Sequence, residues 1–222
     1  MTKPYTLHNR LGSGGFAIEA VLALADIPHE LVLLESIPGS DLSEEFQKVN
    51  PWRQVPVLVT PDGRTVTETA AILFYLAEEH ETLRTGPQLY IDDNAAFYRW
   101  GVFMVVNLYE GMLRLVYPGR YAKDRDVAPE EIDKAVRRAA AARNHEAFGL
   151  IERQLEDRSG LCGDRLSPID VLCAMLCAWH RPRPDLPRCT ALTKSVASHP
   201  VVAPIWARNF NHWLEFDWTK PD

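Results

Sequence analysis

The sequence has few cysteines and lacks the patterns by which cysteines build a disulfide framework or a metal site. All four cysteines lie in the second half of the chain, and no C-x-x-C pair occurs among Cys162, Cys173, Cys177 and Cys189. Scattered cysteines of this kind favour free thiols in a reducing compartment. Cys173 and Cys177 stand one helical turn apart among apolar residues, so we predict that both are buried in a helical core.

Basic clusters and long apolar runs are also missing. The net charge is −6, and the longest basic run is the pair Arg137–Arg138. This charge pattern argues against nucleic acid or an anionic membrane as the main partner. No apolar run approaches the roughly 20 residues that span a bilayer, and no signal-peptide pattern precedes the strand-like residues 5–9. We therefore expect a cytoplasmic protein.

Signature motifs of several enzyme classes are absent. No H-x-x-E-H, G-x-S-x-G or paired-carboxylate motif occurs, so metal-dependent hydrolysis and serine-hydrolase chemistry are unsupported and no metal is expected. The glycine-rich residues 9–15 are not followed by the G-K-[ST] of a phosphate-binding loop. They do lead into a helix, and a helix N-terminus attracts anions through its unpaired N–H groups and its dipole.

Residues 1–80 alternate strands and helices. The residue patterns predict strands over residues 5–9 and 31–34, and helices over residues 16–25 and 43–49. The first helix ends before Pro28, because proline cannot continue a helical turn. Residues 31–34 are continuously apolar, which is typical of a strand covered on both faces. This order predicts a mixed sheet with helices on both faces.

A predicted hairpin follows. Residues 57–60 and 65–67 alternate as short strands around the turn-forming residues 61–64, and a helix with an apolar face begins at Glu68-Thr69. Pro56 stands directly before the first of these strands, although proline cannot donate to a sheet. A cis Val55–Pro56 bond would turn the N–H and C=O groups of Val55 toward a ligand.

Residues 81–90 are typical of a linker, and residues 91–222 contain only helical patterns. A long helix is expected over residues 92–115, and another begins at Pro129 and runs to about residue 155. Ser167 and Asp170 have the spacing of a capping box at the start of a third helix. Two further helices are expected over residues 189–198 and 201–210.

The motif set N-P-x-x-x-V-P-x-L, D-G, E-[ST]-x-x-I and Y-L resembles the glutathione transferase superfamily. It stands here as Asn50-Pro51, Val55-Pro56, Leu58, Asp62-Gly63, Glu68-Thr69, Ile72 and Tyr75-Leu76. The stretch from Cys162 to Asp170 is similar to the family's G-x-x-x-[ST]-x-x-D. The resemblance covers essentially the whole chain. It implies a thioredoxin-like βαβαββα domain over residues 1–80, a linker over residues 81–90 and an all-helical domain over residues 91–222.

The resemblance also implies a glutathione transferase with a role in detoxification. Glutathione would be its cosubstrate, a small and largely apolar electrophile its second substrate, and a homodimer its assembly. Aligning residues 16–22 with the family places Ser13 where serine-type members keep the hydroxyl that stabilises the glutathione thiolate, and Gly14 where cysteine-type members keep a thiol. Asn9, near the place of the phenol in tyrosine-type members, is the alternative to Ser13. A hydrogen-bond donor at this place would lower the pKa of the glutathione thiol. The alternative is that Ser13 has no catalytic role and only occupies a tight turn.

Six residues are expected to hold the tripeptide. The cysteinyl part would pair with the backbone of Val55, as an added strand would, beside Pro56. Thr69 would bind the α-carboxylate of the γ-glutamyl end and Glu68 its ammonium group. The remaining two, Gln54 and Arg53, would reach the glycyl carboxylate. Arg53 departs from the small residue that is usual in the family, and Thr69 from the commoner serine.

The resemblance also implies a pocket for the electrophile between the two domains, against the first long helix of the helical half. Candidate residues are Tyr109, Met112, Met104, Tyr117 and Phe16. The Tyr109 phenol is suited to donate to a leaving group or an oxyanion.

Three functional hypotheses remain open at this point. The first is thiolate attack on an electrophile, leading to conjugation or to glutathione-dependent isomerisation, dehalogenation or ether cleavage. The second is a non-catalytic glutathione-binding or regulatory protein of the same fold. The third, a glutathione-dependent thiol reductase, is disfavoured because the active-site cysteine is missing.

Overall fold

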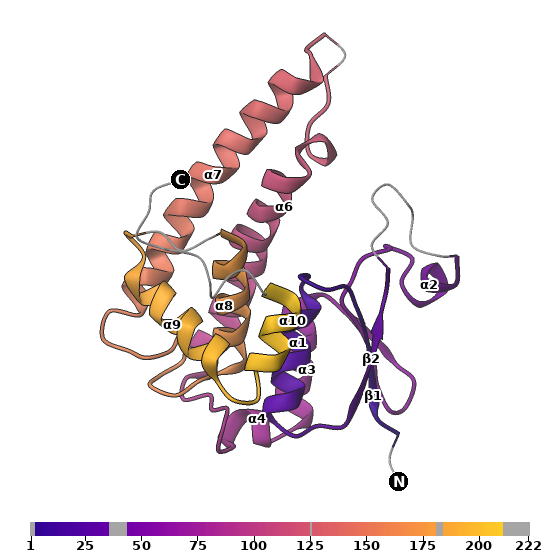
Figure 1. Cartoon of the computed structure of the whole chain (residues 1–222), viewed down its shortest axis with the longest axis vertical. Coiled ribbons are helices and arrows are strands. Elements are labelled where there is room, and N and C mark those ends of the chain that lie inside the picture. Colours follow the sequence, from indigo (N-terminus) through magenta and orange to yellow (C-terminus); the bar gives the residue numbers. More distant parts are fainter. Residues whose placement is uncertain (1–2, 36–43, 125, 181–183, 211–222) are drawn as a thin grey trace.

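The computed structural model of the chain describes residues 3–35, 44–124, 126–180 and 184–210. A small sheet with flanking helices lies beside a larger group of helices (Figure 1). The elements of the first part, in chain order, are β1 (Tyr5–Asn9), α1 (Gly15–Leu24), β2 (His29–Leu33), α2 (Glu44–Val49), β3 (Val57–Val59), β4 (Thr65–Thr67) and α3 (Thr69–Glu79). Ser43, the expected start of the second helix, lies outside the described residues.

The sheet is mixed, as predicted. Its strand order is β2-β1-β3-β4, with β1 parallel to β2 and β3 antiparallel to both of its neighbours. Leu7 in the middle of β1 lies opposite Leu31 on one side and Leu58 on the other. Helices α1 and α3 cover one face of the sheet, and α2 lies on the other side (Figure 1). Because β3 is antiparallel to β1, the start of β3 lies beside the end of β1, where His8 pairs with Val57 and the chain continues into the loop before α1.

One prediction about this sheet is wrong. We expected residues 31–34 to be covered on both faces, but β2 is an edge strand, and Val32 and Leu33 are 37% and 45% exposed. A short apolar run indicates a strand without indicating its place in the sheet. The central position belongs to β1, whose Leu7 is fully buried.

The second part is helical. Its elements are α4 (Thr82–Thr85), α5 (Asn94–Phe103), the π-helical η1 (Met104–Tyr109), α6 (Glu110–Val116), the 3₁₀ turn η2 (Pro118–Arg120), α7 (Pro129–Gln154), α8 (Pro168–His180), α9 (Pro187–Ser198) and α10 (Ala203–Phe210). Helix α8 packs against α9, α5 and η1 as well as against α1 and α3 of the first part. The expected long helix over residues 92–115 is the continuous run α5–η1–α6. Helix α4 lies inside the segment that we expected to be a linker. None of the described helices has both the length and the apolar character needed to cross a bilayer.

A continuous apolar core joins the two parts. Helices α8 and α10 pack on α1, and the Phe16 ring of α1 meets Trp206 and Phe210 edge-on, at centroid distances of 5.3 and 5.0 Å. Cys173 and Cys177 are buried in α8, as predicted. Because α1 is held from both sides, the loop before it is fixed relative to the helical part.

At the start of α8, Asp170 reaches back to the Ser167 N–H as the predicted capping box requires, but the Ser167 hydroxyl donates to Asp170 instead of accepting from a backbone N–H. The Asp170 carboxylate accepts hydrogen bonds from the Ser167 backbone N–H at 2.8 Å, the Ser167 hydroxyl at 2.6 Å and the Leu161 backbone N–H at 2.8 Å. Asp170 and Ser167 are both fully buried. The cap therefore satisfies donors that would otherwise be buried without partners.

Candidate functional site

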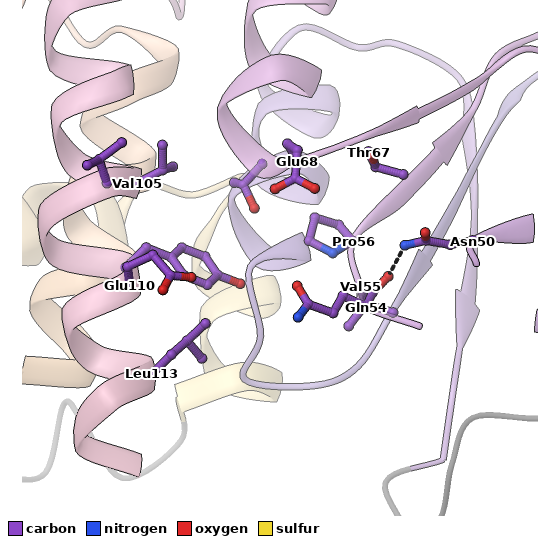
Figure 2. Close-up of a pocket in the computed structure, with 12 residues that line it drawn as sticks. Asn50, Gln54, Val55, Pro56, Thr67, Glu68, Val105, Glu110 and Leu113 are labelled. Carbon is purple, nitrogen blue, oxygen red and sulfur yellow. Dashed lines mark hydrogen bonds between the residues drawn. The ribbon is translucent and has the colours of Figure 1, made fainter. Parts of the chain in front are cut away.

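A cavity of about 240 Å³ lies between the sheet-bearing part and the α5–η1–α6 run. Figure 2 shows Val105, Glu110 and Leu113 on the helical wall, facing Glu68, Pro56 and Gln54 on the other wall. The full lining also includes Asn50, Val55, Thr67, Thr69, Val106 and Tyr109. Polar groups dominate one wall and apolar groups the other, an arrangement suited to a ligand with two chemically different parts.

The loop before β3 forms part of the polar wall. The Val55–Pro56 peptide bond is cis, and Val55 stands before the first paired residue of β3, Val57. The loop is held by the buried Asn50, whose Nδ2 donates to the carbonyl oxygen of Gln54 at 2.8 Å and whose Oδ1 accepts from the Trp52 N–H at 3.0 Å. Asn50 was part of the motif set but not of our expected site, and its buried amide makes it a residue that shapes the cavity.

Glu68 and Thr69 stand at the beginning of α3 and line the cavity. Glu68 has a φ of 67°, a conformation that costs a non-glycine residue about 1–3 kcal/mol. Its side chain is exposed, whereas Thr69 is buried. A carboxylate thus stands next to a hydroxyl and a helix N-terminus, which together can bind a group that carries both an ammonium and a carboxylate.

Arg53 and the two candidate thiolate stabilisers do not line the cavity. Arg53 is exposed with a φ of 59°. The Ser13 hydroxyl donates to Asn9 Oδ1 at 2.6 Å, and Asn9 is fully buried at the end of β1. A Cβ on Gly15 would lie 2.1 Å from Asn9 Oδ1, so only glycine fits at the start of α1. In the structure, Ser13 and Asn9 thus form a compact junction between β1 and α1.

Tyr109 reaches that junction from the helical wall. A Cβ built on Gly14 would lie 2.5 Å from the Tyr109 phenol oxygen and 2.8 Å from Thr69 Oγ1. Burial raises the pKa of Tyr109 to about 12, and the opposing effects are hydrogen bonds with the Thr69 hydroxyl and the Gly14 backbone. The Glu68 carboxylate adds to the rise in the pKa, and Arg10 opposes it. The phenol therefore keeps its proton at neutral pH.

The other expected electrophile residues lie elsewhere. Phe16 and Met104 are fully buried in the core. The Met112 sulfur accepts from Asn144 Nδ2 at 3.2 Å, and the Tyr117 ring lies under Arg120, whose guanidinium carbon is 4.1 Å from the ring centroid. The helical wall instead has Val105, Tyr109 and Leu113 at every fourth position. That spacing was visible in the sequence, but our choice of aromatic and methionine residues passed over the valines.

Two helices far along the chain hold the loop before α1. The Trp179 indole N–H, on α8, donates to the Gly12 carbonyl oxygen at 3.0 Å, and the Gly12 N–H donates to Asn209 Oδ1, on α10, at 2.9 Å. The Trp179 ring also meets the Tyr109 ring edge-on, with centroids 5.0 Å apart. No local pattern in the sequence indicated these contacts.

Comparisons with known proteins agree with this architecture. Residues 17–79 match the family model described as glutathione S-transferase, N-terminal domain. The uncharacterised GST-like protein YncG of Escherichia coli (strain K12) is 31% identical over 166 residues, which are 74% of this chain and 77% of that protein. The maleylacetoacetate isomerase of Rattus norvegicus is 39% identical over 88 residues, which are 39% of this chain and 40% of the isomerase.

A solved structure shows the likeness of fold across nearly the whole chain. It is a glutathione transferase homologue from Sulfitobacter with bound glutathione, and it superposes with a TM-score of 0.78 over 95% of this chain and 100% of that chain, at 18% identity. The predicted fold, a thioredoxin-like first part followed by helices, is thereby confirmed.

Proposed function

Because the chain belongs to the glutathione S-transferase superfamily, we propose that its cavity binds glutathione and presents the thiolate to a small, largely apolar electrophile. The observation that carries this proposal is the pairing of Glu68 and Thr69 with the Val55–Pro56 loop on one wall of the cavity, opposite an apolar helical wall. We assign residues 1–80 to glutathione binding and residues 91–222 to the electrophile, joined by residues 81–90.

The polar wall has groups that match each part of the tripeptide. The N–H and hydroxyl of Thr69 suit the γ-glutamyl carboxylate, and the Glu68 carboxylate suits its ammonium group. The backbone of Val55, beside Pro56, suits the cysteinyl part as an added strand. The side chain of Gln54 suits the glycyl carboxylate, and the exposed Arg53 adds positive charge near that end.

The apolar wall suits the second substrate. Val105, Val106 and Leu113 offer aliphatic surface, and the Glu110 carboxylate beside them disfavours an anionic electrophile. In conjugation the sulfur forms a bond to the electrophilic carbon, the leaving group departs with its electron pair, and the thiol proton passes to water. The N-terminus of α1 favours the thiolate through its dipole.

The structure suggests a different role for the predicted thiolate stabilisers. Ser13 donates its hydroxyl hydrogen to Asn9, and neither residue lines the cavity. We propose that Ser13 and Asn9 stabilise the loop that precedes α1. The hydrogen bond to the glutathione sulfur would then come from another residue.

We also propose a homodimer that works in the cytosol, where the buried thiols stay reduced. Tyr98 and Val102 stand one helical turn apart on α5, outside the cavity lining, and are 37% and 51% exposed. An exposed apolar face of this kind is suited to contact a second copy. Light scattering after size exclusion tests this assembly: the parent is expected as a dimer and Val102→Glu as a monomer. A monomeric parent would rule the dimer out.

A second candidate reaction is glutathione-dependent isomerisation. It is favoured by the 88-residue match to maleylacetoacetate isomerase. The two reactions differ in the net consumption of glutathione, because conjugation consumes it and isomerisation returns it unchanged. Measuring free glutathione during turnover of each substrate class therefore separates them.

Calorimetry with glutathione tests the proposed binding. The parent is expected to bind, and Thr69→Ala to bind about tenfold more weakly, because one hydrogen bond to a charged group is lost. Thr65→Ala, at the exposed first residue of strand β4, is the matched control and is expected to bind as the parent does. Absence of binding by the parent would contradict the proposal. Binding without turnover of a chlorodinitrobenzene-type substrate would favour a non-catalytic, regulatory role.

A further inference from the structure

The Tyr109 phenol fills the space beside Gly14. Gly14 has no side chain, and the phenol oxygen of Tyr109 lies 2.5 Å from the point where a Cβ would stand. A hydroxyl from the helical wall thus takes the place that a side chain of residue 14 would fill. Any larger residue at position 14 would displace this hydroxyl from the start of α1.

The hydroxyl of the neighbouring Ser13 points to another partner. It donates to Asn9 Oδ1 at 2.6 Å, and Asn9 is fully buried. A serine hydroxyl has one hydrogen to donate, and here that hydrogen goes to an amide oxygen. Tyr109, in contrast, lines the cavity together with Val55, Glu68 and Thr69.

The immediate surroundings of Tyr109 leave its own hydrogen available. The Gly14 backbone N–H can only donate to the phenol oxygen. The phenol can therefore accept this hydrogen bond while it donates to a ligand atom in the cavity. Burial keeps it protonated, since the pKa of Tyr109 is raised to about 12.

The backbone of the helical wall contributes to this placement. Tyr109 is the last residue of the π-helical stretch η1, and the residue after it begins α6. Such π-helical turns are rare and frequently occur at functional sites. The Trp179 ring meets the Tyr109 ring edge-on at 5.0 Å and restricts its orientation.

We propose that the Tyr109 phenol donates the hydrogen bond that stabilises the glutathione thiolate in this protein. The helical half, rather than the loop before α1, would then supply the group that acts on the sulfur. This inference rests on the proposed binding of glutathione in the cavity. In chemical terms, the thiol loses its proton to water and the phenol keeps its own, so the phenol acts as a donor and not as a base.

The test is an ultraviolet titration of the thiol of bound glutathione, after calorimetry has established binding. In Tyr109→Phe the thiol pKa is expected to rise by about one to two units, because a hydrogen bond to the charged form is lost. This variant keeps the ring that contacts Trp179, so it should fold. Ser13→Ala is expected to shift the thiol pKa by less. Tyr90→Phe, a tyrosine outside the cavity lining, is the matched control.

Three results would overturn the inference. One is a thiol pKa that is unchanged in Tyr109→Phe but raised in Ser13→Ala, which would identify Ser13 as the hydrogen-bond donor to the sulfur. Another is weaker glutathione binding by Tyr109→Phe with an unchanged thiol pKa, which would assign the phenol to the carboxylate end near Thr69. The third is a parent that does not bind glutathione in calorimetry. This result also removes the proposed function, and it is recognised before any titration.

Discussion

The indole N–H of Trp179 donates a hydrogen bond to the carbonyl oxygen of Gly12 over 3.0 Å. The two residues lie on α8 and in the loop before α1, and the same Trp179 ring contacts Tyr109. One side chain in the helical part thus contacts both the loop before α1 and the phenol that meets its start. These contacts of Trp179 explain how the two walls of the cavity are held in a fixed position relative to each other.

Replacing Trp179 by phenylalanine should weaken this link. The variant keeps a ring near Tyr109 but loses the donor to Gly12, so we expect the free energy of unfolding to fall by about 1 kcal/mol and turnover to fall several-fold. Urea unfolding and steady-state kinetics measure the two effects. Trp100→Phe is the matched control, because the Trp100 N–H is buried with no hydrogen-bond partner among the described residues. Equal loss of turnover in both variants would contradict the role of the Trp179 N–H.

Gly14→Ala should impair turnover more than folding. Its Cβ would stand 2.5 Å from the Tyr109 phenol oxygen, so the ring must move away from the start of α1. We expect kcat/KM to fall at least tenfold, which is about 1.4 kcal/mol in transition-state stabilisation. Gly149→Ala, in α7, is the control: its Cβ would meet only Arg153 at 3.8 Å, and alanine favours a helix. Parent-like kinetics of Gly14→Ala would show that the phenol position is unimportant.

His8 should make the protein less stable in mild acid. Burial lowers the pKa of His8, and its Nδ1 is buried without a hydrogen-bond partner among the described residues. The unfolded chain therefore binds more protons than the folded chain below about pH 6.5, and stability is lost as the pH falls through that value. His8→Phe should lose less unfolding free energy between pH 7.5 and 5 than the parent does. Burial also lowers the pKa of His80, so His80 continues to contribute to the pH dependence of stability in both proteins.

The control for this measurement is His199→Gln, since His199 bonds to the exposed Gln88 side chain. Urea unfolding at several pH values provides the data. If His8→Phe had the same pH dependence as the parent, the buried imidazole would not be the source of the acid sensitivity.

Asp170→Ala should strongly destabilise the fold. It removes the acceptor of three hydrogen bonds and leaves the Leu161 and Ser167 N–H groups buried without it. We expect a loss of about 3 kcal/mol in unfolding free energy. Asp126→Ala, at an exposed position, should change it by less than about 0.5 kcal/mol. A loss below 1 kcal/mol in Asp170→Ala would mean that water replaces the carboxylate at the cap.

Features with local signals were predictable from the sequence. The Ser167-x-x-Asp170 cap depends on residues three apart, and the hairpin around Gly63 depends on turn residues within one short segment. The exposure of Val32 and Leu33 was not predictable in this way, because the strand order places β2 at the edge of the sheet.

The site was only partly predictable for the same reason. Glu68, Thr69 and Val55 belong to one contiguous motif and lie together in the cavity lining. Contacts such as Trp179 with Gly12 join residues 167 positions apart, and chain folding alone brings them together. The Ser13–Asn9 hydrogen bond depends on side-chain orientations within the loop, which the residue types left open.

The most direct test of the account is a crystal structure of the protein grown with glutathione. We predict tripeptide density in the cavity, with its γ-glutamyl end on Glu68 and Thr69 and its sulfur within hydrogen-bonding distance of the Tyr109 phenol oxygen. Glutathione bound elsewhere, or a cavity left empty at saturating glutathione, would contradict the account.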